Sequence, residues 1–352
     1  MLNSPRNAGP RMHCTLLIPG LLTPGASSET TGDLRLAELE VAFARGDSRV
    51  RENISCDQWL CDEFGVSVDG DIPAAPLMLK ADGGDPQEDF WFCANPVHLR
   101  ADRSRLVLSA QIEDLTGDEA IKLVDTLNKH FSQDRVRFLA PTPRHWYIQK
   151  EGVPRMLTTP LAHAMNRSVD GHLPKGDDAL EWNRIVNEAQ MILHAHPVNE
   201  AREARGATVV NSIWPWGGGR MPSLKPSDYI TVWGGDDFAR ALGKAANIPD
   251  ADLPTSGTEW LREPRERSHL IVFNGAADAL RAGDIARWRE ELIRLDQNWV
   301  KPLLSAVRAG KISLLRLVAC NMEHLIEATL NRAALWRIWR RSRSVTDYVT
   351  PA

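Results

Sequence analysis

In the last third of the chain, short apolar segments with strand character alternate with helical segments. Strands are expected at Thr208–Trp214, Leu270–Phe273 and Leu314–Cys320, and helices at Phe238–Ala245 and Ile285–Leu303. Strands that alternate with helices form parallel sheets, because each helix carries the chain back across a face of the sheet. The alternation therefore predicts an α/β fold with a mainly parallel sheet covered by helices.

The first two thirds of the chain supply a buried strand, several helices and a mixed middle region. An apolar run predicts the first strand at Cys14–Ile18, and the Pro and Gly behind it leave the run too short for a membrane helix. Further helices are expected at Leu34–Arg45, Ser55–Phe64, Asp118–His130 and Asp177–His194, and further short strands at Pro73–Leu79, Phe90–Cys93, Leu106–Leu108, Val136–Leu139 and His145–Ile148. The 352 residues suit two domains, or one large domain with an insertion.

Composition and charge exclude several classes of protein. Apolar residues make up 43% and charged residues 25% of the chain, which is typical of a soluble globular protein. The net charge of −4 gives no argument for nucleic acid or for an anionic membrane as partner. The five cysteines are scattered and form no CxxC pair, so neither a zinc ribbon nor a disulfide framework is indicated. We expect reduced thiols and a cytoplasmic location.

A glycine-rich segment behind the Thr208–Trp214 strand is the first candidate ligand site. Gly217, Gly218 and Gly219 are followed directly by Arg220. Glycines let a backbone approach a ligand and expose its N–H groups, and the arginine can bind a phosphate or carboxylate through two hydrogen bonds. The alternative is a tight turn beside packed tryptophans.

The surrounding residues resemble a known family. The stretch from His196 to Pro222 reads HPVNEAREARGATVVNSIWPWGGGRMP, which resembles the pattern HPVNxxRxxxGxxPANxIWLWGxGRxP of the archaeal-type, 2,3-bisphosphoglycerate-independent phosphoglycerate mutases. Pro215 replaces the aliphatic residue between the two tryptophans. Three further stretches resemble that family. In the first, Arg100 matches and Asp102 stands in for Asn, and in the second Arg144 matches. In the third, Asp237 opens a helix that ends in Gly243.

The resemblance implies an alkaline-phosphatase-like fold, a mainly parallel sheet with helices on both faces and an inserted α+β domain. The core would comprise residues 1–93 and 205–352, and the insertion residues 94–204. Enzymes of this family use two divalent cations and a serine nucleophile, which carries the phosphoryl group between the two hydroxyls of glycerate.

Several positions where the family carries metal ligands hold other residues here. Ala277 and Arg281 stand where the family has Asp and His, and an arginine cannot lose its proton to bind a cation. The last predicted strand leads into Asn321 rather than an Asp-His pair, and the first strand ends at Gly20 without an Asp. Asp278 and Asp284 are the remaining metal candidates. We therefore expect no metal or other cofactor.

The residues for nucleophile and ligand binding follow from the same resemblance. Ser55, Cys56 and Asp57 resemble the family's Ser-Asp nucleophile segment, with a helix-capping serine and a buried cysteine as the alternative. The ligand-binding candidates are the basic and glycine-rich residues that match the family, with structural ion pairing as the alternative for the arginines. They are Arg100, Arg144, Arg202, Asn211, Trp216, Gly217, Gly218, Gly219 and Arg220.

Retained basic residues without a metal site suggest binding without turnover. We thus expect a catalytically degenerate, binding or regulatory protein, similar to a degenerate bacterial regulatory subgroup of the family. Its ligand would be a phosphorylated or carboxylated small molecule, and the Trp- and Arg-rich stretch Trp336–Arg343 could touch an acidic protein partner. Membrane binding is not expected, and nucleic acid is a weaker candidate. The alternative is a metal-dependent phosphoglycerate mutase or related phosphoryl-transfer enzyme that uses Mn, Zn or Mg.

Overall fold

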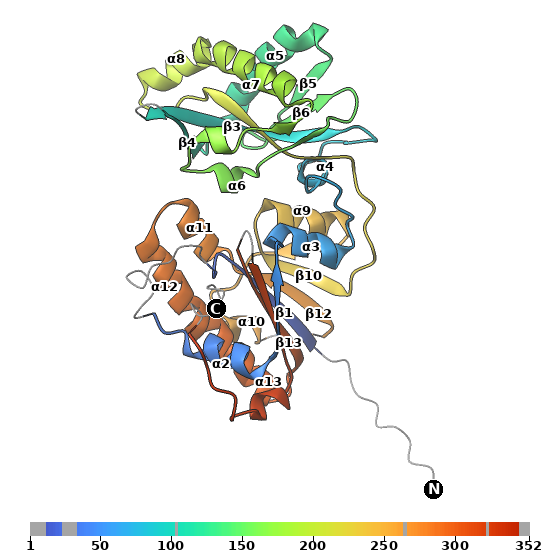
Figure 1. Cartoon of the computed structure of the whole chain (residues 1–352), viewed down its shortest axis with the longest axis vertical. Coiled ribbons are helices and arrows are strands. Elements are labelled where there is room, and N and C mark those ends of the chain that lie inside the picture. Colours follow the sequence, from blue (N-terminus) through green and yellow to red (C-terminus); the bar gives the residue numbers. More distant parts are fainter. Residues whose placement is uncertain (1–11, 23–33, 103–104, 263–265, 322–323, 345–352) are drawn as a thin grey trace. The chain divides into compact units, whose positions relative to one another are not determined.

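The computed structural model describes residues 12–22, 34–102, 105–262, 266–321 and 324–344 (Figure 1). The chain divides into two compact units, of which unit 1 takes in the residues up to Phe64 and from Lys225 onward, and unit 2 comprises Gly65–Leu224. The predicted insertion at 94–204 is therefore too short on both sides. The reason is that β3 (Trp91–Asp102) pairs with β9 (Ser212–Gly219), so residues on both flanks of the predicted insertion belong to the sheet of unit 2.

Unit 1 is built on a seven-stranded sheet in the order β11-β10-β12-β1-β13-β14-β2. The strands from β11 to β13 run parallel, and β14 and β2 complete one edge in antiparallel pairing. Among the described residues, none of the strands from β3 to β9 belongs to this sheet. The middle of the chain is therefore an insertion between the parts that form the parallel sheet. The strands are β1 (Met12–Pro19), β2 (Asp47–Glu52), β10 (Tyr229–Gly234), β11 (Asp250–Ala251), β12 (Ser268–Val272), β13 (Ile312–Cys320) and β14 (His324–Leu330).

The central strand β1 explains why the sheet forms. It is hydrogen-bonded to β12 on one side and to β13 on the other, and Leu16, Leu17 and Ile18 are fully buried. A strand covered on both faces needs a continuous apolar run rather than alternation, and this is what the sequence provides. The predicted first strand is thus confirmed.

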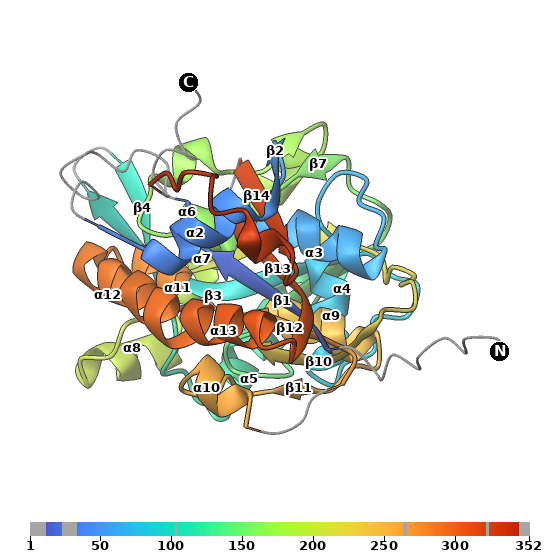
Figure 2. The same cartoon turned by 90° about the horizontal axis from the view of Figure 1, so that it is seen from below.

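Helices cover both faces of this sheet (Figures 1 and 2). Helices α2, α12 and α13 share one apolar core with β1 and β13, and α3 and α9 lie on the opposite face. In the described part of the chain, no helix is long and apolar enough to cross a membrane. The helices of unit 1 are α2 (Ala37–Arg45), α3 (Cys56–Phe64), α9 (Asp237–Ala245), α10 (Gly257–Trp260), α11 (Gly275–Arg281), α12 (Ile285–Leu295) and α13 (Lys301–Arg308).

Unit 2 contains an antiparallel five-stranded sheet in which β3 is central. Buried side chains of β3, α5 and α7 form its main apolar core, and a smaller cluster lies around Trp214. Besides β3 and β9, its strands are β4 (Arg105–Gln111), β5 (Val136–Leu139), β6 (Tyr147–Lys150) and the separate pair β7 (Met156–Leu157) and β8 (Lys175–Gly176). Its helices are α4 (Ala74–Ala81), α5 (Gly117–His130), α6 (Leu161–Ala164), α7 (Ala179–His194) and α8 (Pro197–Ala204).

Three local predictions are wrong. The apolar run at Pro73–Leu79 forms helix α4, because a short apolar run does not distinguish a buried helix from a buried strand. The glycine-rich segment is the second half of strand β9 and not a turn. The expected helix at Ile285–Leu303 is divided by a π-helical turn at Asp296–Val300.

That π-helical turn stabilises another helix far away in sequence. Asp296 is buried, and its Oδ1 accepts the backbone N–H of Leu39 at 2.8 Å, while its Oδ2 accepts that of Glu38 at 3.4 Å. Leu36 precedes α2 and provides no side-chain cap, so Asp296 supplies the acceptor that the start of α2 lacks.

We expect Asp296→Ala to lower the free energy of unfolding by about 1–3 kcal/mol, because it leaves buried N–H groups without a partner. Asp296→Asn keeps one acceptor oxygen and should lose less. Urea unfolding followed by far-UV circular dichroism measures both variants. Equal losses in the two variants would show that the acceptor does not matter.

Candidate functional site

The carboxyl ends of the parallel strands in unit 1 gather the chemically useful side chains. In open parallel sheets, ligands bind outside these ends, where the loops converge. Here β1 leads into Gly20, β10 into Gly235 and Asp236, β12 into Phe273 and Asn274, and β13 into Asn321. Helix α3 begins in the same place, because Cys56 at its start is disulfide-bonded to Cys320 at the end of β13.

The backbone around this disulfide is closely packed. The Cα atoms of Cys56 and Cys320 are 5.6 Å apart, and the carbonyl of Cys320 accepts the N–H of Gly20 at 3.1 Å. Gly20 has φ +78°, and a Cβ there would lie 2.8 Å from the backbone nitrogen of Ala277, so α11 packs directly against the end of β1. The expectation of five reduced thiols is therefore wrong for Cys56 and Cys320.

Two partly buried carboxyls and one guanidinium lie at this junction. Burial and, to a smaller extent, the charge of Asp236 raise the pKa of Asp57 to about 7, against the opposing charge of Arg281. Burial also raises the pKa of Asp236, against the N–H of Ala239 and the charge of Arg281. Asp236 also caps α9, since its Oδ1 accepts the Ala239 N–H at 3.0 Å. Arg281 thus acts on both carboxyls.

The three nucleophile candidates have different surroundings. The hydroxyl of Ser55 accepts the N–H of Gln58 at 3.1 Å. Ser55 therefore caps helix α3, which is the structural alternative named above for this residue. Cys56 is held in the disulfide, and the charges of Asp236 and Arg281 act on Asp57. Among the three, Asp57 is the one whose environment moves its titration into the neutral range.

The side chains at this end of the sheet do not fit a pair of divalent cations. Asp278 forms an ion pair with Arg281, and Asp284 caps α12 by accepting the N–H of Arg287 at 2.9 Å. Within the described ranges, no group of three or more His, Cys, Asp or Glu side chains is placed to hold a metal ion. The buried Oδ1 of Asn274 has no hydrogen-bond partner, but a single amide oxygen is a poor donor set for a cation.

The glycine-rich candidates in unit 2 serve packing. The N–H of Gly217 donates to the Thr158 hydroxyl at 3.1 Å, and that of Gly218 donates to Asp71 at 3.4 Å, so protein groups already use these donors. A Cβ on Gly218 would lie 2.2 Å from the ring of Phe92, and one on Gly219 would lie 2.5 Å from Pro73. Close packing in strand β9 is a sufficient reason for these glycines.

The neighbouring polar candidates also have protein partners. The indole N–H of Trp216 donates to Asn95 at 2.7 Å. The side chain of Asn211 bonds both backbone groups of Leu99, at 2.7 and 2.8 Å. Both therefore join β9 and its flank to β3.

Arg202 is a structural residue. Its side chain is 0% exposed, donates to the carbonyl of Thr208 at 2.8 Å and pairs with Asp114 and with Glu119, the latter at 3.0 Å. Burial raises the pKa of Glu119, but the N–H of Thr116 and the guanidiniums of Arg205 and Arg202 bring it down to about 2. These contacts give Arg202 a structural role, and ligand binding by it stays a prediction.

The other three arginines lie at the surface of unit 2. Arg144 pairs with Glu113 at 3.0 Å, Arg220 donates to the carbonyl of Glu88, and Arg100 is exposed near the end of β3. Their role in ligand binding stays a prediction.

The sequence analysis does not include Asp236 among the candidate site residues, and it treats Arg281 only as the replacement of a metal ligand. The signal for Asp236 was present: Gly234, Gly235 and Asp236 directly follow an apolar strand and open a helix. The partnership of Arg281 with Asp57 had no local signal, since the two residues are far apart in the chain.

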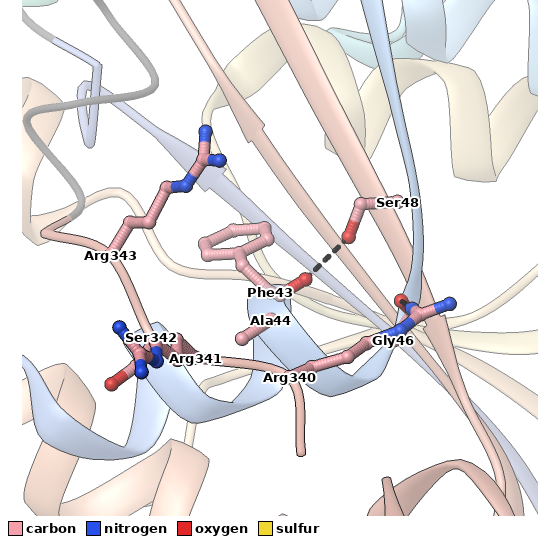
Figure 3. A pocket seen from close by; sticks show the side chains of 8 residues that line it. All are labelled: Phe43, Ala44, Gly46, Ser48, Arg340, Arg341, Ser342 and Arg343. Carbon is pink, nitrogen blue, oxygen red and sulfur yellow. Dashed lines mark hydrogen bonds between the residues drawn. The ribbon is translucent and has the colours of Figure 1, made fainter. Parts of the chain in front are cut away.

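Two hollows lie at the opposite, amino end of the sheet. One, of about 570 Å³, is lined by Phe43, Ala44, Gly46, Ser48 and the segment from Arg340 to Arg343 (Figure 3). Arg340 there already donates to the carbonyl of Gly46 at 2.8 Å. The other, of about 250 Å³, lies among the first residues of β1, β10 and β12, beside the Glu63–Arg316 ion pair. Neither hollow coincides with the carboxyl-end site.

The raised pKa of Asp57 makes stability depend on pH. An aspartate in the unfolded chain titrates near pH 4, whereas folded Asp57 keeps its proton to about pH 7. The contribution of Asp57 to the free energy of unfolding is therefore fully present below about pH 4 and is lost as the pH rises to about 7. We expect Asp57→Asn to flatten this fall in the free energy of unfolding, whereas Asp62→Asn, an exposed position of the same helix, should not. Urea titrations at several pH values test this, and an unchanged slope in Asp57→Asn would contradict it.

Arg202 and Arg205 form a matched pair, because both donate to Glu119. Arg202→Ala should destabilise the protein by about 3 kcal/mol, since it leaves buried groups unpaired. Arg205→Ala removes a half-exposed side chain and should cost less than about 1 kcal/mol. Comparable losses in chemical denaturation would refute the assignment of Arg202 as a buried structural ion pair.

Comparison with known proteins bears on both sequence and fold. A family model described as 2,3-bisphosphoglycerate-independent phosphoglycerate mutase matches residues 86–199. The mutase of that name from Methanosarcina acetivorans is 31% identical over 178 residues, which is 49% of this chain and 44% of the relative. The one from Methanothrix thermoacetophila is 29% identical over 216 residues, or 56% and 54%. The matched stretches thus span about half the length of these relatives.

A solved structure extends the similarity of fold. The cofactor-independent phosphoglycerate mutase from Thermoplasma acidophilum superimposes with a TM-score of 0.51 at 14% identity, over 97% of this chain and 96% of that one. This confirms the predicted α/β fold with a mainly parallel sheet, which this chain shares with that mutase.

The comparisons contradict the expectation of a catalytically degenerate regulatory protein. The matching family model and the relatives described above are named as mutases, and none of them carries a regulatory name. The family model matches residues 86–199, which do not include the positions discussed above as former metal ligands. Sequence over residues 86–199 and fold over nearly the whole chain thus relate this protein to the 2,3-bisphosphoglycerate-independent phosphoglycerate mutases.

Proposed function

We propose that this protein is an isomerase of the phosphoglycerate mutase type, which moves a phosphoryl group between two hydroxyls of a small phosphorylated carboxylate. The names of its relatives support this class of reaction. The observation that carries the proposal is that the start of α3, the start of α9 and helix α11 lie at the carboxyl end of the parallel sheet, and that the charge of Arg281 acts there on Asp57 and Asp236.

Phosphoryl transfer requires that negative charge is stabilised and that protons move to and from hydroxyls. A guanidinium binds two oxygens of a phosphoryl group at once, and Arg281, which pairs with Asp278, is the basic residue at this end of the sheet that we assign to this role. Asp57, with a pKa of about 7, exists in both protonation states near neutral pH. It can therefore give a proton to a departing hydroxyl oxygen and take one from the incoming hydroxyl.

Arg100, Arg144 and Arg220 are exposed, and ligand binding by them stays a prediction. The family resemblance also implies two divalent cations, but the donor set at the carboxyl end does not fit them. The mechanism proposed here therefore uses only the side chains of the chain itself.

Interconversion of 3- and 2-phosphoglycerate by the purified protein, followed by a coupled assay, tests the proposal. We expect Arg281→Ala to lower kcat about 10²–10³-fold, because it removes the main charge opposite the phosphoryl group. Arg287→Ala, at an exposed position of the neighbouring helix, should leave the rate unchanged. The assay is run as isolated, with a dithiol reductant, with a chelator and with added Mn²⁺. Absence of turnover under all of these conditions would overturn the proposed function, and equal rates in the two variants would remove Arg281 from it.

A further inference from the structure

Three large apolar side chains lie exposed within a short segment of unit 1 that follows β14. Trp336 is 71% exposed, Ile338 72% and Trp339 74%. The other ten tryptophans of the chain are buried or partly buried. Tryptophan loses much apolar surface to water when it stays exposed, and large apolar side chains that gather on a surface mark sites of interaction. This segment is therefore the place in unit 1 where a partner would gain most from burying apolar surface.

The backbone that carries these side chains is attached to the body of unit 1. A short 3₁₀ helix, Ala334–Trp336, places Leu335 in the main apolar core. The carbonyl of Leu335 accepts a guanidinium N–H of Arg45 at 3.0 Å. Arg337 donates to the carbonyl of Arg45 at 3.3 Å and to Asp47 at 3.2 Å. The exposed side chains thus stand on a fixed support, and binding a partner costs little ordering of the backbone.

The arginines that follow give this surface an uncompensated positive charge. Arg340, Arg341 and Arg343 line the hollow of about 570 Å³, and none of the described residues that line it is acidic (Figure 3). The nearest carboxylate, Asp47, pairs with Arg337 and lies 3.9 Å from Arg340. Within the described part of the chain, Arg341 and Arg343 have no ion-pair partner. The hollow therefore calls for carboxylates from another molecule.

The combination of groups decides between kinds of partner. A guanidinium binds a carboxylate through two parallel hydrogen bonds, and tryptophan and arginine are the residues that contribute most to binding at protein–protein interfaces. A nucleic acid or an anionic membrane presents dense negative charge over a wide area, which the net charge of −4 of this chain opposes. A protein segment brings a few carboxylates together with apolar side chains, and it meets both features of the surface.

We propose that the Trp–Arg surface, formed by Trp336, Ile338, Trp339, Arg341 and Arg343, docks an acidic segment of a partner protein. The aromatic and aliphatic side chains bury apolar side chains of that segment, and the two arginines bind its carboxylates. This inference goes beyond the proposed function, since none of these residues belongs to the carboxyl-end site. Either one can fail while the other stands.

Fluorescence anisotropy with labelled synthetic peptides tests the chemistry of the partner. The probe is a peptide of Asp-Glu-Leu repeats, and its controls are Asp-Glu-Ser repeats, which lack the apolar side chain, and Lys-Lys-Leu repeats, which reverse the charge. We expect the first peptide to bind the wild type at least about tenfold more tightly than either control. Its affinity should fall as the ionic strength rises, because salt screens exposed charges. Equal binding of the three peptides, or no binding of the first, overturns the proposal.

Two double variants test the place of binding. Trp336→Ser with Trp339→Ser, and Arg341→Glu with Arg343→Glu, should each weaken binding of the Asp-Glu-Leu peptide at least about tenfold. Arg137→Glu makes the same change of charge at an exposed position of β5 in unit 2 and should bind as the wild type. Far-UV circular dichroism checks that each variant is folded. Unchanged binding in both double variants overturns the assignment of this surface.

The other occupants of the surface are separate outcomes. The wild type and both double variants are also mixed with a labelled single-stranded oligonucleotide and with vesicles of phosphatidylcholine and phosphatidylserine. Tighter binding of either probe than of the acidic peptide, lost in the double variants, overturns the protein partner in favour of nucleic acid or membrane. Sedimentation velocity tests a second copy of the chain. A wild-type dimer that the tryptophan variant converts to a monomer overturns the proposal in favour of self-association.

Discussion

The parallel pairing of β1 with β12 and β13 is the constraint on which the site depends. Leu17 lies opposite Val272 on one side, and Pro19 lies opposite Cys320 on the other. This register ends the three strands at the same level, so that the loops behind them meet. The burial of β1 on both faces holds the register, since a slip by one residue would exchange the side chains of its two faces. Without this register, the segments that carry Cys56, Asp236 and Arg281 would not meet at one end of the sheet.

Much of the fold was predictable because its signals are local. Continuous apolar runs mark β1, β12 and β13, and apolar residues at helical spacing mark α5 and α7. The failures occur where a local pattern fits two structures. Pro73–Leu79 is such a short apolar run, and the antiparallel strands β2 and β14 have no continuous apolar run that distinguishes them. The borders of unit 2 depend on the pairing of β3 with β9, which no local pattern reveals.

The site was harder to predict because its members act through distant contacts. Matching positions to a family pattern pointed to Asp278 and Asp284, yet one pairs with Arg281 and the other caps a helix. The same matching pointed to Gly218, where the ring of Phe92 leaves no room for a side chain. Asp57 was found as a candidate, but its pKa depends on burial and on Asp236 and Arg281, which only the folded sheet brings near it.

The Cys56–Cys320 bond has a consequence for the assembly of unit 1 as well. Unit 1 consists of two separate stretches of chain, with the whole of unit 2 between them, and the bond joins one stretch to the other across 264 residues. Closing so long a loop removes conformational entropy from the unfolded chain that is worth on the order of 5 kcal/mol. When unit 1 opens, the bond still keeps α3 and β13 at a high effective concentration, so the stretches that the insertion separates meet again as parts of one molecule.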